Sequence, residues 1–292
     1  MKKETSAKIR YISAMVIFGT IGLFVRSIPL SSGLIAMVRG FVGAAFLVLV
    51  MALTHQKPAL DAVRKELWKL IVSGALIGFN WILLFEAYRY TTVATATLCY
   101  SLSPTFVVLA SPLTFHEKLT LKKILCVLAA LIGMVFVSGA ADGGLPSAGE
   151  LKGILLGIGA AILYASIITI SKSIRETPPY EKTIVQLFSA GVVLVPYCLL
   201  TGSGVSGSVS PAAVGLLLFV GIVHTGIAYW LYFGSMTDIP LHTVAIFGYI
   251  DPIVAVLLSA LILREEMSPG KWLGAVLIIG AALISELPEK KR

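Results

Sequence analysis

Long apolar runs separated by short polar breaks fill most of this chain. A helix needs about 20 mainly apolar residues to cross the hydrocarbon core of a bilayer, and ten runs come close to that length. They cover residues 11–27, 31–53, 67–88, 92–113, 122–140, 152–172, 182–201, 211–233, 241–263 and 270–286. The pattern predicts an all-α membrane protein with ten transmembrane helices and no soluble domain.

Composition supports this class of protein. The chain is 57% hydrophobic and 13% charged, with a mean hydropathy of +0.93, whereas soluble proteins carry about 25% charged residues. The net charge of +8 does not indicate a nucleic-acid partner, because the basic residues fall between the apolar runs. Cys99, Cys126 and Cys198 lie inside apolar runs without nearby histidines, so we expect reduced packing residues, no metal site and no cofactor.

The distribution of lysine and arginine predicts the orientation. With the N-terminus inside, the inner ends and connections collect seventeen basic residues, against five on the outer side. Cytoplasmic loops carry the excess of basic residues, so both termini should be cytoplasmic. The first run lacks a small-residue cleavage site and should remain as the first helix. We expect a multi-pass protein of a cell membrane, with the bacterial cytoplasmic membrane favoured.

The two halves of the chain can be aligned with an offset of 148 residues. The aligned pairs are Leu83 and Leu231, Phe85 and Phe233, Thr95 and Thr243, Pro104 and Pro252, Glu117 and Glu265, and Lys123 and Lys271. Five helices precede the second copy, so it should enter the membrane in the opposite sense. The prediction is two inverted five-helix repeats, residues 1–145 and 146–292, that share a site near the midplane.

The motifs in these repeats resemble the EamA domain of the drug/metabolite transporter superfamily. In the first copy they run from Glu86 to Pro104, then through residues 116–120 and 128–133. The second copy runs from Gly226 through Pro252 and residues 264–268 to Gly280. The resemblance implies ten helices, alternating access and, for most members, export of small metabolites. It names no substrate, because one scaffold serves many functions.

Asp251 is the first candidate for a functional residue, because an acid within an apolar run is costly unless it faces protein or water. It lies about ten residues into its run, hence ~15 Å deep. It could bind a substrate cation or carry a coupling proton, or it could be a structural carboxylate. Pro252, and Pro104 in the first half, should each break a helix, since proline withholds a backbone N–H.

Arg39 is the second candidate, about eight residues from the outer end of its run and hence ~12 Å deep. Two roles are open for it: it could bind a substrate carboxylate, or it could form a permanent ion pair with Asp251. The resemblance also carries an arginine that many members have in this helix onto Arg39. Trp81 could stack on an organic substrate or pack between helices. Asn80 is a further substrate-binding candidate, although Asn80, Trp81 and Glu86 do not share one helix face.

The remaining candidates surround these residues in the sequence. Tyr100 and Tyr249 flank the two proline breaks and are candidates for substrate binding. Glu86 and Arg89, at spacing i, i+3, are expected to form a structural or gating pair. His224 lies in the middle of its run. It is either a second proton-coupling candidate, in addition to Asp251, or a hydrogen-bonded core histidine.

These features together predict a secondary active transporter that works by alternating access through a central cavity. Arg39 and Asp251 at similar depths favour a zwitterion such as an amino acid, with export favoured. Its partners would be the small-molecule substrate, the lipid bilayer and, for coupling, protons. One alternative is an organic-cation or drug transporter, and a distant one is a membrane-embedded enzyme. The sequence contains no paired acids, Ser/His pair or metal cluster at usable spacing, so we expect no enzyme activity. It does not determine the oligomeric state.

Overall fold

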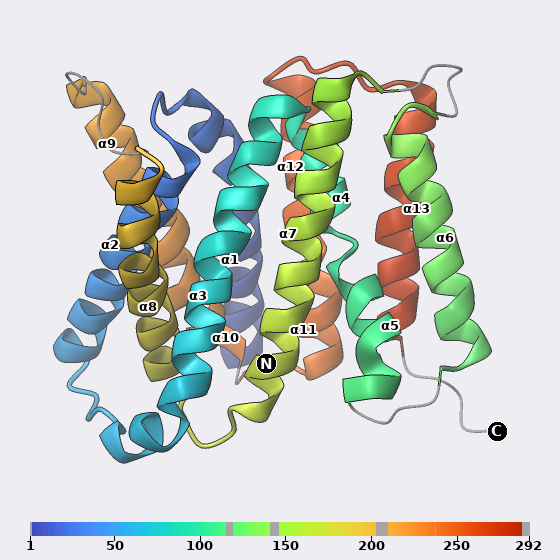
Figure 1. Ribbon diagram of the computed structural model, residues 1–292. Helices are drawn as coiled ribbons and strands as arrows, with labels where there is room; N and C mark the ends of the chain where they lie inside the picture. The colour runs from blue at the N-terminus through green and yellow to red at the C-terminus, as the bar shows by residue number, and fades with distance from the viewer. Residues whose placement is uncertain (1, 115–118, 141–145, 203–209, 237, 288–292) are drawn as a thin grey trace.

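A computed structural model describes residues 2–114, 119–140, 146–202, 210–236 and 238–287. Over these residues the chain forms helices and no strands. Most of them stand side by side in one bundle (Figure 1). The prediction of an all-α membrane protein is therefore confirmed.

One to three helical segments cover each of the ten apolar runs. The first half contains α1 (Lys2–Ser27), α2 (Ser32–Leu53), α3 (Leu60–Tyr90), α4 (Val93–Tyr100), α5 (Ser103–Thr114) and α6 (Leu121–Val137). The second half contains α7 (Ala148–Ser173), α8 (Pro179–Leu200), α9 (Pro211–Phe219), η2 (Val220–Ile227), α10 (Ala228–Met236), α11 (Leu241–Gly248), α12 (Ile250–Leu261) and α13 (Pro269–Glu286). In the described part of the chain, eight helical segments are long and apolar enough to cross a membrane, and Ile246–Leu261 forms a shorter apolar helix.

The fourth and ninth apolar runs are both interrupted near their middle. The chain leaves α4 at Tyr100 and enters α5 at Ser103, and it leaves α11 at Gly248 and enters α12 at Ile250. Pro104 and Pro252 therefore lie in the first turns of α5 and α12, where a proline displaces no helical hydrogen bond. The breaks fall immediately before the two prolines that the sequence marks.

The packing of the helices follows a pattern that pairs the two halves. α3 packs on α7 as α10 packs on α1, and α5 packs on α7 as α12 packs on α1. α6 packs against α13, and α2 packs against α8. In the 148-residue alignment α3 corresponds to the α9–η2–α10 segment, α5 to α12 and α6 to α13. These contacts are those that two related five-helix halves would make.

Both ends of the described chain lie on one side of the bundle, at the bottom of Figure 1. We call this the terminal side, where α1 begins and α13 ends, and we call the opposite side the far side. The three cysteines, Cys99, Cys126 and Cys198, are buried and free. Their burial fits the expected packing role, and the reduced state stays a prediction.

Two glycines show why the helices approach so closely at the centre. A Cβ atom on Gly40 would lie 2.7 Å from the carbonyl oxygen of Leu187, on α8. A Cβ atom on Gly19, in α1, would lie 2.6 Å from the carbonyl oxygen of Asp251. In a bilayer the hydrophobic effect does not drive helices together, so close contact between small residues has to supply the packing energy. These glycines therefore bring α2, which carries Arg39, against α8, and α1 against the start of α12, which carries Asp251.

Candidate functional site

Arg39 is buried in the middle of α2, with 2% of its surface exposed. Its Nε donates a hydrogen bond to Thr225 Oγ1 at 3.0 Å. Its guanidinium carbon lies 4.0 Å from the ring centre of Trp81 and 5.2 Å from that of Phe85. Nη1 has no hydrogen-bond partner in the described structure. The guanidinium is thus held from one edge and stacked on aromatic rings, while one nitrogen stays available to a ligand.

The partner of Arg39 lies in an unusual helical segment. η2 is a π-helix, and the hydroxyl of Thr225 contacts the carbonyl oxygen of Val220, five residues earlier, at 3.4 Å. Such segments are rare and occur frequently at functional sites. Thr225 is fully buried against α2, where a Cβ atom on Gly43 would overlap its side chain. The π-helix therefore brings a hydroxyl to Arg39 without offering it a counter-charge.

Asp251 is the second residue of α12 and is half-buried. Its carboxylate makes no hydrogen bond or ion pair with any residue that the structure describes, so the pair with Arg39 is not formed. Tyr88, Tyr100 and Tyr229 each lie within electrostatic range of both charges. We call Arg39, Asp251 and these three tyrosines the central polar cluster. Arg39 and Asp251 thus lie near the same three phenol groups and are not bonded to each other.

The substrate-binding candidates Asn80, Trp81, Tyr100 and Tyr249 make different contacts. Asn80 is buried and donates to the carbonyl oxygen of Ala160, on α7, at 2.6 Å. Trp81 stacks on Arg39, on α2, so these two neighbouring residues contact different helices. Tyr100 packs on Tyr164, with ring centres 5.2 Å apart. Tyr249 lies between α11 and α12 and is half-buried.

The Glu86–Arg89 pair lies at the far-side end of α3. The two charged groups are 3.8 Å apart, and Arg89 also donates to the carbonyl oxygen of Leu30. The arginine therefore holds the end of α3 to the connection between α1 and α2. Whether the pair also acts as a gate stays a prediction.

His224 lies in η2, next to Thr225, with 1% of its surface exposed. Its Nε2 is 2.9 Å from Thr20 Oγ1, and the hydroxyl of Thr20 donates to the carbonyl oxygen of Ile17 at 2.7 Å. Because the threonine proton is used in this way, we assign the imidazole proton to Nε2. Nδ1 is then a buried acceptor without a partner in the described structure. His224 is therefore hydrogen-bonded through one ring nitrogen, while the other is a buried acceptor; its role in proton coupling stays a prediction.

Two buried carboxylates bridge the halves, one on each side of the bundle. On the far side, Glu265 pairs with Arg26, accepts from the backbone N–H of Val93 at 2.8 Å and contacts Ser259. Glu265 thus binds nearby backbone, hydroxyl and basic groups. Glu117, which aligns with Glu265 in the repeat, lies outside the described residues.

On the terminal side, Glu66 of α3 accepts three hydrogen bonds from the connection between α7 and α8. They come from the hydroxyl and the N–H of Thr177, at 2.7 and 3.0 Å, and from the N–H of Arg175, at 3.0 Å. These bonds and those of Glu265 tie the first half of the chain to the second on both sides of the central polar cluster.

Sequence reasoning missed several of these residues. Thr225, Thr20 and Glu66 make key bonds, but a single threonine or a glutamate near a helix end carries little signal. The adjacent His224–Thr225 pair, polar within an apolar run, was the signal available for Thr225. Phe85 was aligned with Phe233 but was not linked to Arg39. Over the described residues, no group of three or more His, Cys, Asp or Glu side chains could hold a metal ion.

Comparison with known proteins agrees with this fold. The model of the EamA-like transporter family matches residues 7–139 and 151–286. "Uncharacterized transporter YxxF" of Bacillus subtilis (strain 168) is 28% identical over 285 residues, which cover 97% of this chain and 90% of that protein. "Protein PecM" of Dickeya dadantii (strain 3937) is 28% identical over 224 residues, covering 75% and 73%. One crystal structure matches with a TM-score of 0.65 and 20% identity over 96% of each chain, which shows the fold alone.

The apolar helices and the named relatives define a multi-pass membrane transporter. The chain belongs to the EamA-like transporter family, which confirms the resemblance seen in the sequence. The family and its relatives indicate transport and not an enzymatic reaction.

Proposed function

We propose that this protein is a secondary active transporter that moves a small zwitterion, such as an amino acid, by alternating access through the central polar cluster. The observation that carries the proposal is that its two charges are not bonded to each other. Among the described residues, Nη1 of the buried Arg39 has no partner, and the half-buried carboxylate of Asp251 makes no bond. A buried charge is costly unless it is paired, so a site of this kind gains when a ligand supplies both missing partners.

A zwitterion supplies those partners at its two ends. Its carboxylate would accept from Arg39 Nη1, because a guanidinium offers several donors to a carboxylate. Its ammonium group would lie against Asp251 and the rings of Tyr88, Tyr100 and Tyr229, since aromatic faces attract cations. Trp81 would hold the guanidinium in place through the stacking seen in the structure.

The bonds on the two sides of the bundle support alternating access. Glu265 joins α1 and α4 to the second half on the far side, and Glu66 joins α3 to the α7–α8 connection on the terminal side. Opening one side requires one set of bonds to break while the other set holds. Each of these carboxylates would thus act as part of a gate, with the cluster between them.

We further propose ten membrane spans in two inverted five-helix repeats, residues 1–145 and 146–292, with both termini in the cytoplasm. The two separate matches of the family model and the paired helix contacts support the repeat. The excess of basic residues on the terminal side supports the orientation. The expected location is the bacterial cytoplasmic membrane, and Asp251 and His224 would accept coupling protons. Export is the favoured direction.

The direct test is counterflow in liposomes with a panel of amino acids. We expect saturable uptake of at least one labelled amino acid into vesicles loaded with the unlabelled compound. Arg39→Lys should reduce it strongly, because lysine cannot reproduce the Thr225 bond and the stacked plane together. Asp251→Asn should reduce it and change its dependence on pH. Uptake that is unaffected by both substitutions would contradict the proposed site.

One observation favours an organic cation as a second candidate substrate. Asp251 is within electrostatic range of Tyr164 as well as the three tyrosines of the cluster, which gives an anionic site with aromatic walls. Arg39→Ala separates the two candidates, because it should abolish transport of a zwitterion and spare that of a cation. Product formation without movement of solute would instead indicate a membrane-embedded enzyme.

A further inference from the structure

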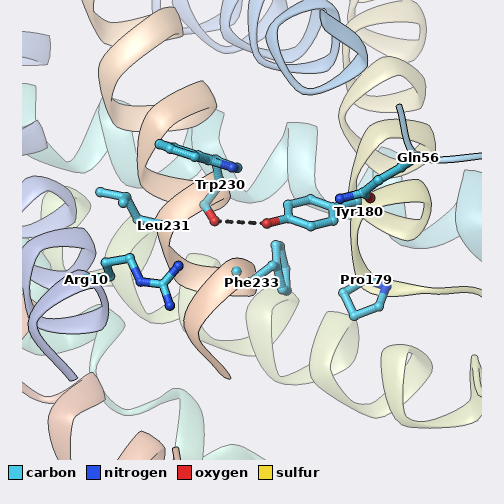
Figure 2. A pocket seen from close by; sticks show the side chains of 8 residues that line it. Arg10, Gln56, Pro179, Tyr180, Trp230, Leu231 and Phe233 are labelled. Carbon is cyan, nitrogen blue, oxygen red and sulfur yellow. Dashed lines mark hydrogen bonds between the residues drawn. The ribbon is translucent and has the colours of Figure 1, made fainter. Parts of the chain in front are cut away.

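A cleft lies on the terminal side of the bundle, outside the central polar cluster. It has a volume of 350 Å³ and is lined by Arg10 of α1, Gln56 of the α2–α3 connection, Pro179 and Tyr180 of α8, and Trp230, Leu231, Phe233 and Gly234 of α10. We call it the terminal-side cleft. In Figure 2, Tyr180 and Gln56 approach from one side, and Arg10 and Trp230 from the other.

The cleft exists because α8 and α10 meet poorly on this side. α2 and α3 pack along each other in the first half, whereas α8 and α10 of the second half have little contact. The Tyr180 hydroxyl crosses the gap to the carbonyl oxygen of Trp230 at 3.2 Å, and its ring meets that of Phe233 edge-on. A gap between helices in a bilayer is filled by lipid or water when side chains do not fill it.

Arg10 gives the cleft a positive charge that the surrounding residues pair only in part. Its guanidinium makes no hydrogen bond with any described residue, and its Nε is buried without a partner. The nearest carboxylate is Asp238, 3.9 Å from Nη2, which is longer than a hydrogen bond. The arginine side chain is 41% exposed, so its terminal nitrogens can be reached from the cleft.

The depth of the cleft matches the boundary between acyl chains and headgroups. Arg10 is seventeen residues from the far-side end of α1, and Trp230 is nineteen residues from the start of α9. At 1.5 Å per residue these spans are about 25 and 28 Å, close to the ~30 Å thickness of a hydrocarbon core. Tryptophan and tyrosine concentrate at this level, and basic pockets between helices bind anionic headgroups there.

We propose that the terminal-side cleft binds an anionic phospholipid, with its phosphate on Arg10 and its glycerol region between Tyr180 and Trp230. The phosphate would accept from the terminal nitrogens of Arg10, and the amide of Gln56 would bind the polar headgroup. The upper part of one acyl chain would lie against the half-exposed ring of Trp230. This site is separate from the proposed transport site and does not depend on which solute is moved.

The test compares phosphatidylglycerol with phosphatidylcholine on the purified full-length protein in detergent. A ligand that binds the folded protein raises its apparent melting temperature, and we expect phosphatidylglycerol to do so more than phosphatidylcholine. Arg10→Gln should weaken the phosphatidylglycerol effect by about tenfold in apparent affinity, the range for one charge-assisted bond. Lys8→Gln is the matched control, because it removes the same charge two residues away, where the lysine pairs with Glu4 and does not line the cleft, and it should leave the effect unchanged.

A second measurement locates the lipid and does not depend on the stability of the Arg10 variant. Phosphatidylglycerol brominated on its acyl chain should quench tryptophan fluorescence more than brominated phosphatidylcholine, and Trp230→Phe should remove that excess. Equal responses to both lipids, an unchanged Arg10→Gln variant, or excess quenching that survives Trp230→Phe would overturn the proposal. Equal stabilisation by glycerol 3-phosphate would show that the cleft takes a free phosphate ester and not a lipid.

Discussion

Replacement of Arg39 by methionine should stabilise the protein while it abolishes transport of a zwitterion. Methionine retains most of the length of the side chain and is flexible enough to fill the same space. It removes a buried cation that has no counter-ion in the structure, and it leaves the Thr225 hydroxyl with its contact to the Val220 carbonyl. The substitution therefore creates no new buried polar group without a partner.

The magnitude follows from opposing contributions. The variant loses the bond to Thr225, worth about 1.5–3 kcal/mol for a charged donor, and stacking on Trp81, worth about 2 kcal/mol in a desolvated site. It also avoids the desolvation of an ion, which costs several kcal/mol, and replacements of buried ions by apolar groups have been stabilising by about 1–4 kcal/mol. We expect a net gain in this range, which at about 2–4 °C per kcal/mol raises the apparent melting temperature by several degrees.

The assay is thermal unfolding of the purified variants by scanning fluorimetry, with Arg89→Met as control. Arg89 is bonded to Glu86 and Leu30, so its replacement should lower the melting temperature. A fall for Arg39→Met larger than that for Arg89→Met would refute the reasoning, because it would mean that Arg39 has a permanent counter-ion. The double variant with Asp251→Asn tests for that ion directly: independent sites should give additive effects within about 0.5 kcal/mol.

Three further predictions concern other contacts. Gly40→Val should lower the free energy of unfolding by about 1–3 kcal/mol, measured by thermal unfolding, because its Cβ would meet the backbone of α8. Asn80→Ala should cost about 1–3 kcal/mol through loss of the bond to Ala160, and unchanged stability would show that this bond is unimportant. Glu265→Gln should loosen the far side and speed amide hydrogen exchange in the first turn of α4 by about tenfold, corresponding to the loss of one charge-assisted bond. Exchange as slow as in the unaltered protein would argue against a gate there.

The helices and their two central breaks could be predicted from sequence, because their causes are local. Apolar length determines a span, and Pro104 and Pro252 each lack a backbone N–H and so favour the first turn of a new helix. The spacing of Asn80, Trp81 and Glu86 likewise indicates that the three do not share one helix face, although not what each contacts. In the structure Asn80 contacts Ala160 and Trp81 contacts Arg39.

The sequence could not predict contacts that depend on how helices far apart in the chain pack together. The two roles left open for Arg39 differ only in whether Asp251, more than two hundred residues away, is within bonding reach. η2 was not predicted either, since His224 and Thr225 lie in an apolar run that reads as an ordinary helix. Within this π-helix the hydroxyl of Thr225 contacts the carbonyl oxygen of Val220 and also accepts a hydrogen bond from Arg39.

The contrast between α3 and its counterpart has a mechanical consequence. α3 is one continuous rod of 31 residues, whereas the corresponding segment of the second half consists of α9, η2 and α10, with nine, eight and nine residues. A continuous helix tends to move as one rigid element, whereas a segment with a π-helix between two α-helices can change direction within its length. The residue that binds Arg39 lies inside that joint. Under the proposed alternating access, the second half would bend at this segment and move against the first half, with Arg39 bound at the bend.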